Sequence, residues 1–153
     1  MENKLPTDAR FLEAANASDD LHVVIRGHQL VEQGLNAAIA EALREPHALE
    51  VGRLTVGLKI DLGVALGAVR LESRPSFVGL NRLRNRFAHQ SDAALSTQDA
   101  QDLLGTLSPD QRHTLDRLER DVSKGSPREI VSDVLSVLFV EVTAAVGRQA
   151  LWP

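Results

Sequence analysis

Hydrophobic residues recur along this chain at intervals of three and four, which is the period of an amphipathic helix rather than of a strand. The clearest stripe begins after Asp19 and ends near Glu45, and it predicts one long helix. A shorter helical signal around Phe11 and Leu12 precedes it. The stripe of the long helix consists of Leu21, Val24, His28, Val31, Leu35, Ala38 and Ala42.

Breaks and restarts of this pattern predict two more helices in the first 90 residues. Pro46 ends the long helix, because proline cannot continue it. Residues 54–69 repeat the helical spacing, and Gly67 or the residues just after it end this second helix. The third helix begins at residues 73–75 (Ser-Arg-Pro), since proline is tolerated in a first turn, and runs to about His89. The second helix has its apolar stripe at Leu54, Leu58, Leu62, Ala65, Leu66 and Val69.

Glycines inside the first two predicted helices indicate close helix contacts. Gly27 and Gly34 each cost about 1 kcal/mol relative to alanine in a helix, so tight packing against another helix is the expected compensation. Gly63 and Gly67, four residues apart, form a narrow face that could also let a neighbouring helix approach.

Side-chain caps mark three helix starts in the second half of the chain. Ser96, Ser108 and Ser126 each precede a helical segment, and the last two have the Ser-x-x-Gln/Glu form of a capping box. Residues 130–146 are rich in β-branched residues, so a strand has to be weighed against a helix there. Their length and their cap favour a helix, and their apolarity on most sides predicts that it is central and buried.

Composition supports one helical domain. The chain has 153 residues, which suffice for a single core, and 43% apolar with 25% charged residues is typical of a globular protein. Only 3% of the residues are aromatic, which suits helix packing better than a sheet. We therefore predict a single all-α domain over residues 1–153, a bundle of up-down long helices that additional helices over residues 97–150 complete.

Missing features exclude several function classes. The absence of cysteine excludes disulfides, thiolate zinc sites, iron–sulfur clusters and a cysteine nucleophile. The sequence has no phosphate-binding loop, dinucleotide fingerprint, HExxH or GxSxG motif, and its five histidines have no metal-ligand spacing, so we expect neither a metal nor a cofactor. The N-terminus lacks the apolar core of a signal peptide, and no uninterrupted apolar stretch approaches the roughly 20 residues of a bilayer span, so we expect a cytoplasmic protein without membrane contact.

One segment carries a local excess of positive charge. Residues 73–91 hold four arginines and no acidic residue, a charge of +4, whereas the rest of the chain sums to −8. Surface arginines near a helix C-terminus can simply solvate it and complement its dipole. Because carboxylate partners four residues away are missing, a role in facing an anion is comparably favoured. The apolar side of this segment holds Leu80, Leu83 and Phe87, and its polar side holds Arg82, Asn85, Arg86 and His89.

Residues 80–89 also resemble a family signature. The run Leu-Asn-Arg-Leu-Arg-Asn-Arg-Phe-Ala-His is similar to the Arg-x4-6-His motif of the HEPN superfamily, in which a polar residue tends to follow the arginine, as Asn85 does here. Residues 27–36 and 59–67 are similar in order and spacing to the preceding helices of HEPN-like proteins related to the mannitol-operon repressor family. The resemblance covers about residues 21–90.

The resemblance implies an HEPN-like helical bundle that pairs as a homodimer, with the arginine and histidine of each subunit near a shared cleft. Arg84 and Arg82 both satisfy the spacing to His89, and the helical wheel puts Arg82 closer to it, so the identity of the motif arginine stays open. Many relatives are metal-independent endoribonucleases, and others are regulatory or binding modules. The resemblance therefore implies either a toxin- or defence-type ribonuclease acting on RNA, or a non-catalytic regulatory or protein-interaction module, with an antitoxin or regulatory protein as a further partner.

The residue types fit RNA cleavage without a metal. Attack by the 2′-OH needs a proton-transfer group, for which His89 is the candidate, and a fixed cation for the phosphorane oxygens, which Arg84 or Arg82 supplies. Asn85 could hold the imidazole tautomer or donate to phosphate. The alternative for His89 is a cap on its own helix. The candidate phosphate- or RNA-binding residues are Arg82, Arg86 and Arg74.

Four further residues are expected to have structural roles. Asp61 and Glu32 should each pair with an arginine of the basic helix, because a buried carboxylate needs a partner. His28 lies on the apolar stripe of the first long helix and is expected to be a hydrogen-bonded core histidine. Trp152 is expected to be a packing anchor or a dimer contact.

Overall fold

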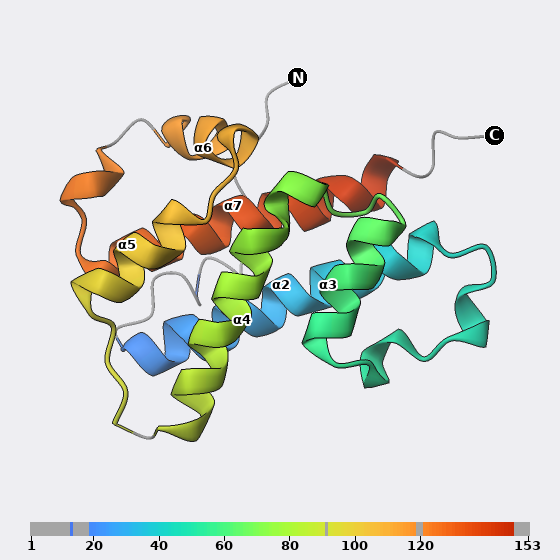
Figure 1. Ribbon diagram of the computed structural model, residues 1–153, viewed down its shortest axis with the longest axis horizontal. Helices are drawn as coiled ribbons and strands as arrows, with labels where there is room; N and C mark the ends of the chain where they lie inside the picture. Colours follow the sequence, from blue (N-terminus) through green and yellow to red (C-terminus); the bar gives the residue numbers. More distant parts are fainter. Residues whose placement is uncertain (1–12, 14–18, 91, 119–120, 149–153) are drawn as a thin grey trace.

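The computed structural model of this chain describes residues 13, 19–90, 92–118 and 121–148, and this part contains helices but no strand (Figure 1). The predicted all-α fold is therefore confirmed. The short helix predicted around Phe11 and the contact expected of Trp152 lie outside the described residues. The α-helices are α2 (Asp20–Ala42), α3 (Val56–Ala65), α4 (Arg74–His89), α5 (Thr97–Gly105), α6 (Pro109–Asp116) and α7 (Pro127–Arg148). Short 3-10 turns span Pro46–Ala48, Val51–Arg53, Leu71–Ser73 and Val122–Lys124.

Helices begin where the capping side chains predict. At the start of α5, Asp99 N donates to Ser96 Oγ at 3.0 Å and Ser96 N donates to Asp99 Oδ2 at 2.9 Å. Ser108 and Ser126 form the same reciprocal box with the side chain three residues later. At the end of α3, Gly67 has a φ of +74°, a left-handed conformation that ends helices and that glycine adopts without steric penalty.

Helices α2 and α7 form a tightly packed central pair. A Cβ atom on Gly27 would lie only 2.6 Å from Leu135 Cδ1, and one on Gly34 only 2.5 Å from Val142 Cγ2. The close contact predicted at these two glycines is therefore confirmed, and its partner is α7. Both contacts advance by seven residues in the same direction on each helix, so α2 and α7 run parallel, as Figure 1 shows.

One carboxylate joins the first turns of these two parallel helices. The Asp20 carboxylate, in the first turn of α2, accepts a hydrogen bond from Leu95 N at 2.9 Å and another from Arg128 Nε at 2.7 Å. These bonds hold the first turns of α2 and α7 together. Four shorter helices carry the chain back to the start of α2 before α7 begins, a connection that hydrophobic periodicity does not reveal.

Helix α7 is a helix rather than a strand, as its length predicted. It is central and well buried, with Val131, Val134, Leu135 and Leu138 inaccessible to solvent. Within the described part of the chain it is the one helix long and apolar enough to cross a membrane. More than half of that stretch is buried inside the fold, which is also the behaviour of a core helix in a soluble protein.

Helix α4 crosses α2 and lies between α3 and α5 (Figure 1). Its apolar side faces the core as predicted, and Leu80, Leu83 and Phe87 are buried there. Helix α3, in contrast, turns inward a different side from the predicted one, because Lys59, Ile60 and Gly63 are buried while Leu58 is 52% exposed. A Cβ atom on Gly63 would meet a side-chain atom of α2 at 3.0 Å, whereas one on Gly67 would meet nothing within 4 Å, so of the two glycines predicted to form a narrow face only Gly63 approaches α2.

Candidate functional site

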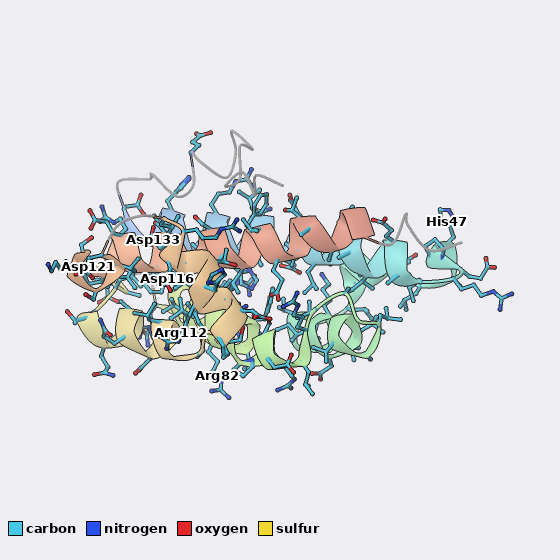
Figure 2. The ribbon with its side chains drawn as sticks, turned by 90° about the horizontal axis from the view of Figure 1, so that it is seen from above. His47, Arg82, Arg112, Asp116, Asp121 and Asp133 are labelled. Atoms are coloured by element: carbon cyan, nitrogen blue, oxygen red, sulfur yellow. The ribbon has the colours of Figure 1, made fainter. Side chains whose placement is uncertain are left out.

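Three exposed side chains of α4 form a polar stripe. Arg82, Asn85 and His89 follow one another at intervals of three and four residues, so they share one side of the helix over two turns. Within the described residues, neither Arg82 nor His89 has an ion pair or a side-chain hydrogen bond. Figure 2 shows Arg82 at the edge of the molecule, pointing away from the helices. We call these three residues the outer stripe.

Arg86 lies beside the outer stripe, but its charge is neutralised. Its Nη1 and Nη2 atoms donate to Oδ1 and Oδ2 of Asp99 on α5, each at 2.6 Å. These hydrogen bonds lower the pKa of Asp99 to about 2 and raise the pKa of Arg86. The guanidinium also lies 5.4 Å from the centre of the Phe87 ring. A phosphate would have to compete with a bidentate carboxylate for Arg86, so the structure gives this predicted phosphate-binding residue an intramolecular partner.

Arg84 faces away from Arg82, toward α2. Two residues along a helix correspond to a rotation of about 200°, which places the two arginines on opposite sides of α4. The Arg84 side chain is half-buried, and its Nη1 donates to Asn85 Oδ1 at 3.1 Å. This bond leaves the amide NH2 group of Asn85 on the outer stripe free to donate. The geometry therefore groups His89 with Arg82 and makes Arg84 a positioning partner of Asn85.

A buried charged cluster lies on the α2 side of α4. Lys59 is only 1% exposed, and its Nζ donates to Glu32 Oε1 at 2.6 Å. His28 is also buried, with its Nδ1 3.8 Å from Glu32 Oε2. Burial lowers the pKa of His28 to about 4, the Glu32 carboxylate opposes that shift and the Arg84 charge adds to it. His28 is thus a neutral core histidine at neutral pH, in line with its predicted place on the apolar stripe.

Sequence reasoning missed Lys59. Glu32 was expected to pair with an arginine of α4, but it forms its ion pair with this lysine of α3. A signal was present, because Lys59 lies one residue before Ile60 and four before Gly63, both of which face inward. The leucine stripe of the same segment predicted that a different side of this helix faces the core, so Lys59 was not expected to be buried.

Asp61 and Arg74 form an ion pair away from the outer stripe. Arg74 Nη2 lies 2.9 Å from Asp61 Oδ1, which is the pairing expected of Asp61 with an arginine of the basic helix. Both side chains are about half-exposed, so Asp61 is not the buried carboxylate that was expected. Arg74 lies in the first turn of α4 and His89 in the last, about 22 Å apart along the helix axis. The structure therefore does not bring Arg74 to the outer stripe.

A groove of about 340 Å³ runs between α4 and α5, and Arg82 lies on its wall. Asp102 lies on the α5 wall, where its Oδ1 accepts a hydrogen bond from Gln98 Nε2 at 2.6 Å. One residue of the outer stripe, Arg82, therefore lines a concave surface, and Asn85 and His89 are not among its lining residues. The groove is lined by Gly79, Arg82, Leu83, Arg86, Asp99, Asp102, Leu103 and Thr106.

Among the described residues, no three histidine, aspartate or glutamate side chains gather in a way that could hold a metal ion. No protein-family model, curated protein or solved structure matches this chain. The function therefore has to be argued from the side chains themselves.

Proposed function

We propose that the outer stripe of α4 binds an RNA phosphodiester and that His89 and Arg82 cleave it without a metal. One observation carries this proposal. Arg82 is the arginine of the basic segment whose guanidinium is exposed and has no protein partner within the described residues, and it shares a helix side with His89. The likeness of residues 80–89 to the HEPN motif is consistent with the same chemistry.

The reaction would be an internal transfer of the phosphoryl group. The 2′-oxygen attacks phosphorus, the bond to the 5′-oxygen breaks, and the products are a 2′,3′-cyclic phosphate and a 5′-hydroxyl. His89 would take the proton from the 2′-OH or give one to the departing 5′-oxygen. Arg82 would stabilise the charge on the non-bridging oxygens, and the Asn85 amide would donate to the same phosphate.

A single imidazole can act at one end of this transfer at a time. A homodimer that brings two α4 helices together would place a second His89 at the other end. The dimer expected from the resemblance would therefore supply a complete acid–base pair, and each subunit would contribute one guanidinium.

The direct test is cleavage of a fluorescently labelled single-stranded RNA in the presence of EDTA. We expect His89→Ala to lose about 100-fold or more of the wild-type rate, which is the usual contribution of a general acid or base. Arg82→Ala should lose a comparable factor. His113→Ala and Arg117→Ala are matched controls, because both residues are exposed near the end of α6, and they should keep the wild-type rate.

Two results would overturn the proposal: cleavage by His89→Ala at the wild-type rate, or a wild-type protein that cleaves no RNA. The first would assign the activity to a contaminating nuclease.

A second candidate function is a non-catalytic regulatory or interaction module. It is favoured by the partners of the other arginines, since Arg74, Arg84 and Arg86 all have side-chain acceptors within the chain. The same RNA can separate the two functions. A regulatory module would either bind it without cleaving it or leave it unbound, and His89→Ala would then behave as the wild type.

A further inference from the structure

The groove between α4 and α5 has opposite charges on its two walls that do not neutralise each other. Arg82 lies on the α4 wall and Asp102 on the α5 wall, and neither has an ion pair within the described residues. Arg86 and Asp99 also line the groove, but they are bound to each other through two short hydrogen bonds. A guanidinium and a carboxylate, neither of them in an ion pair within the described residues, therefore line one groove.

The surface between these two charges is suited to a flat ring. Leu83 and Leu103 contribute apolar surface from the two helices, and the volume of about 340 Å³ lies at the small end of the range for ligand pockets. A molecule that satisfies the whole groove has an anionic group for Arg82, a planar apolar body and N–H donors for Asp102. A nucleotide combines all three features.

We propose that this groove binds a guanine base of the RNA, with Asp102 on its Watson–Crick edge and Arg82 on the adjoining phosphate. This inference rests on the proposed function, because it names the nucleotide that the same site would hold. Proteins commonly recognise single-stranded RNA by enclosing a splayed-out base and hydrogen-bonding its edge.

The charge of Asp102 selects guanine over the other bases. The Watson–Crick edge of guanine presents two adjacent donors, N1–H and N2–H2, which match the two oxygens of a carboxylate. Adenine, cytosine and uracil each place an acceptor beside their single donor group on that edge, so one of their lone pairs would face the negative charge. The hydrogen bond from Gln98 occupies one lone pair of Asp102 Oδ1 and holds the carboxylate in place.

The test measures binding of GMP, AMP, CMP and UMP to the full-length protein by calorimetry. NMR of the 15N-labelled protein records the chemical-shift changes of the Leu83, Leu103 and Thr106 amides on binding. We expect GMP to bind about tenfold more tightly than the other three, which is the order of discrimination that a good bidentate contact provides. Asp102→Asn should remove the preference for GMP, because the amide replaces one acceptor with a donor. Arg82→Ala should weaken all four nucleotides by a similar factor. Asp116→Asn, an exposed aspartate on α6, is the matched control and should leave every affinity unchanged.

The outcomes separate this inference from the proposed function. RNA cleavage that depends on His89, combined with equal affinities for the four nucleotides or with no shifts at the groove, would overturn the guanine pocket and leave the nuclease intact. Preferential GMP binding that Asp102→Asn removes, without any RNA cleavage, would support the pocket and overturn the nuclease. An unchanged preference in Asp102→Asn would also overturn the inference, and thermal unfolding of each variant verifies that it is folded.

Discussion

The two polar sides of α4 carry the same kinds of residue in opposite environments. Toward α2, Arg84 lies beside a cluster in which His28 and Lys59 are buried and Glu32 is only 23% exposed. On the outer stripe, Arg82 and His89 are exposed and have no partner within the described residues. The charged groups on the first side are thus buried and paired within the fold, whereas those on the second side are exposed and unpaired within the described residues.

This difference shows that residue type alone does not identify a functional side chain. A histidine and an arginine occur on both sides, and only their neighbours separate a structural role from a binding role. A buried charge is held by a partner because removing it from water is costly, whereas an exposed guanidinium needs no partner for stability. The following variants test that division, from the largest expected effect to the smallest.

Glu32→Gln should cause the largest loss of stability. It removes the negative charge beside Lys59, and an uncompensated buried charge costs about 3 to 5 kcal/mol of unfolding free energy. Urea unfolding followed by circular dichroism measures the loss, and Glu41→Gln, on an exposed part of the same helix, is the matched control. Adding Lys59→Met to Glu32→Gln should restore most of the stability. Equal midpoints for the two glutamine variants would show that the cluster contributes no more than a surface charge.

The stability of the protein should also fall as the pH drops from about 6.5 to about 4 through His28. Burial lowers the pKa of the folded-state His28 to about 4, while the unfolded chain titrates near the ordinary value of 6.5. Between those pH values only the unfolded chain binds the proton. The unfolding free energy is therefore at its full value above pH 6.5 and falls toward pH 4, by at most about 3 kcal/mol.

The pH dependence can be assigned with two histidine variants. His28→Gln should remove the pH dependence of the unfolding free energy over this range. His113→Gln, which changes an exposed histidine, should keep it. A titration of the imidazole signals by NMR should place the His28 midpoint near 4. A midpoint near 6.5 would mean that the α2 side of α4 is open to water.

Asp99→Asn should reduce stability less than Glu32→Gln does, and it should strengthen anion binding. The asparagine oxygen can still accept from Ser96 N, so the capping box survives in part, but the ion pair with Arg86 is lost. We expect a loss of about 1 kcal/mol, because the pair is partly exposed. Freeing Arg86 should steepen the slope of log affinity for RNA against log salt concentration by about 1. An unchanged slope would show that Arg86 does not face the bound RNA.

Arg82→Ala should have the smallest effect on stability, within about 0.5 kcal/mol, because the side chain has no partner to lose within the described residues. It should nevertheless reduce the salt slope of RNA binding by about 1, whereas Arg84→Ala should leave that slope unchanged. The pair of variants therefore decides which arginine contacts the phosphate. A reduced slope in Arg84→Ala alone would assign the contact to Arg84.

Local features of the fold could be predicted from the sequence. Ser96, Ser108 and Ser126 mark helix starts because capping involves residues only three apart. Gly27 and Gly34 indicate a close contact because a missing side chain inside a helix needs compensation. Neither signal depends on how the helices are arranged.

Features that depend on helix arrangement could not be predicted. Asp99 neutralises Arg86 from a different helix, so the four arginines of residues 73–91 overstated the free charge of that segment. The burial of Lys59 depends on the rotation of α3 about its own axis, which turns Ile60 and Gly63 inward and leaves part of the leucine stripe exposed.

By itself the sequence determined an all-helical chain, the starts of its helices and a basic helix that ends in a histidine, because these properties arise from neighbours within a few residues. Only the tertiary structure decided that α2 and α7 run parallel, that Lys59 is buried with Glu32, and that the side of α4 with Arg82 and His89 is left exposed. The physical reason is that burial and ion pairing depend on which helix faces which, and that choice is made by packing over the whole core.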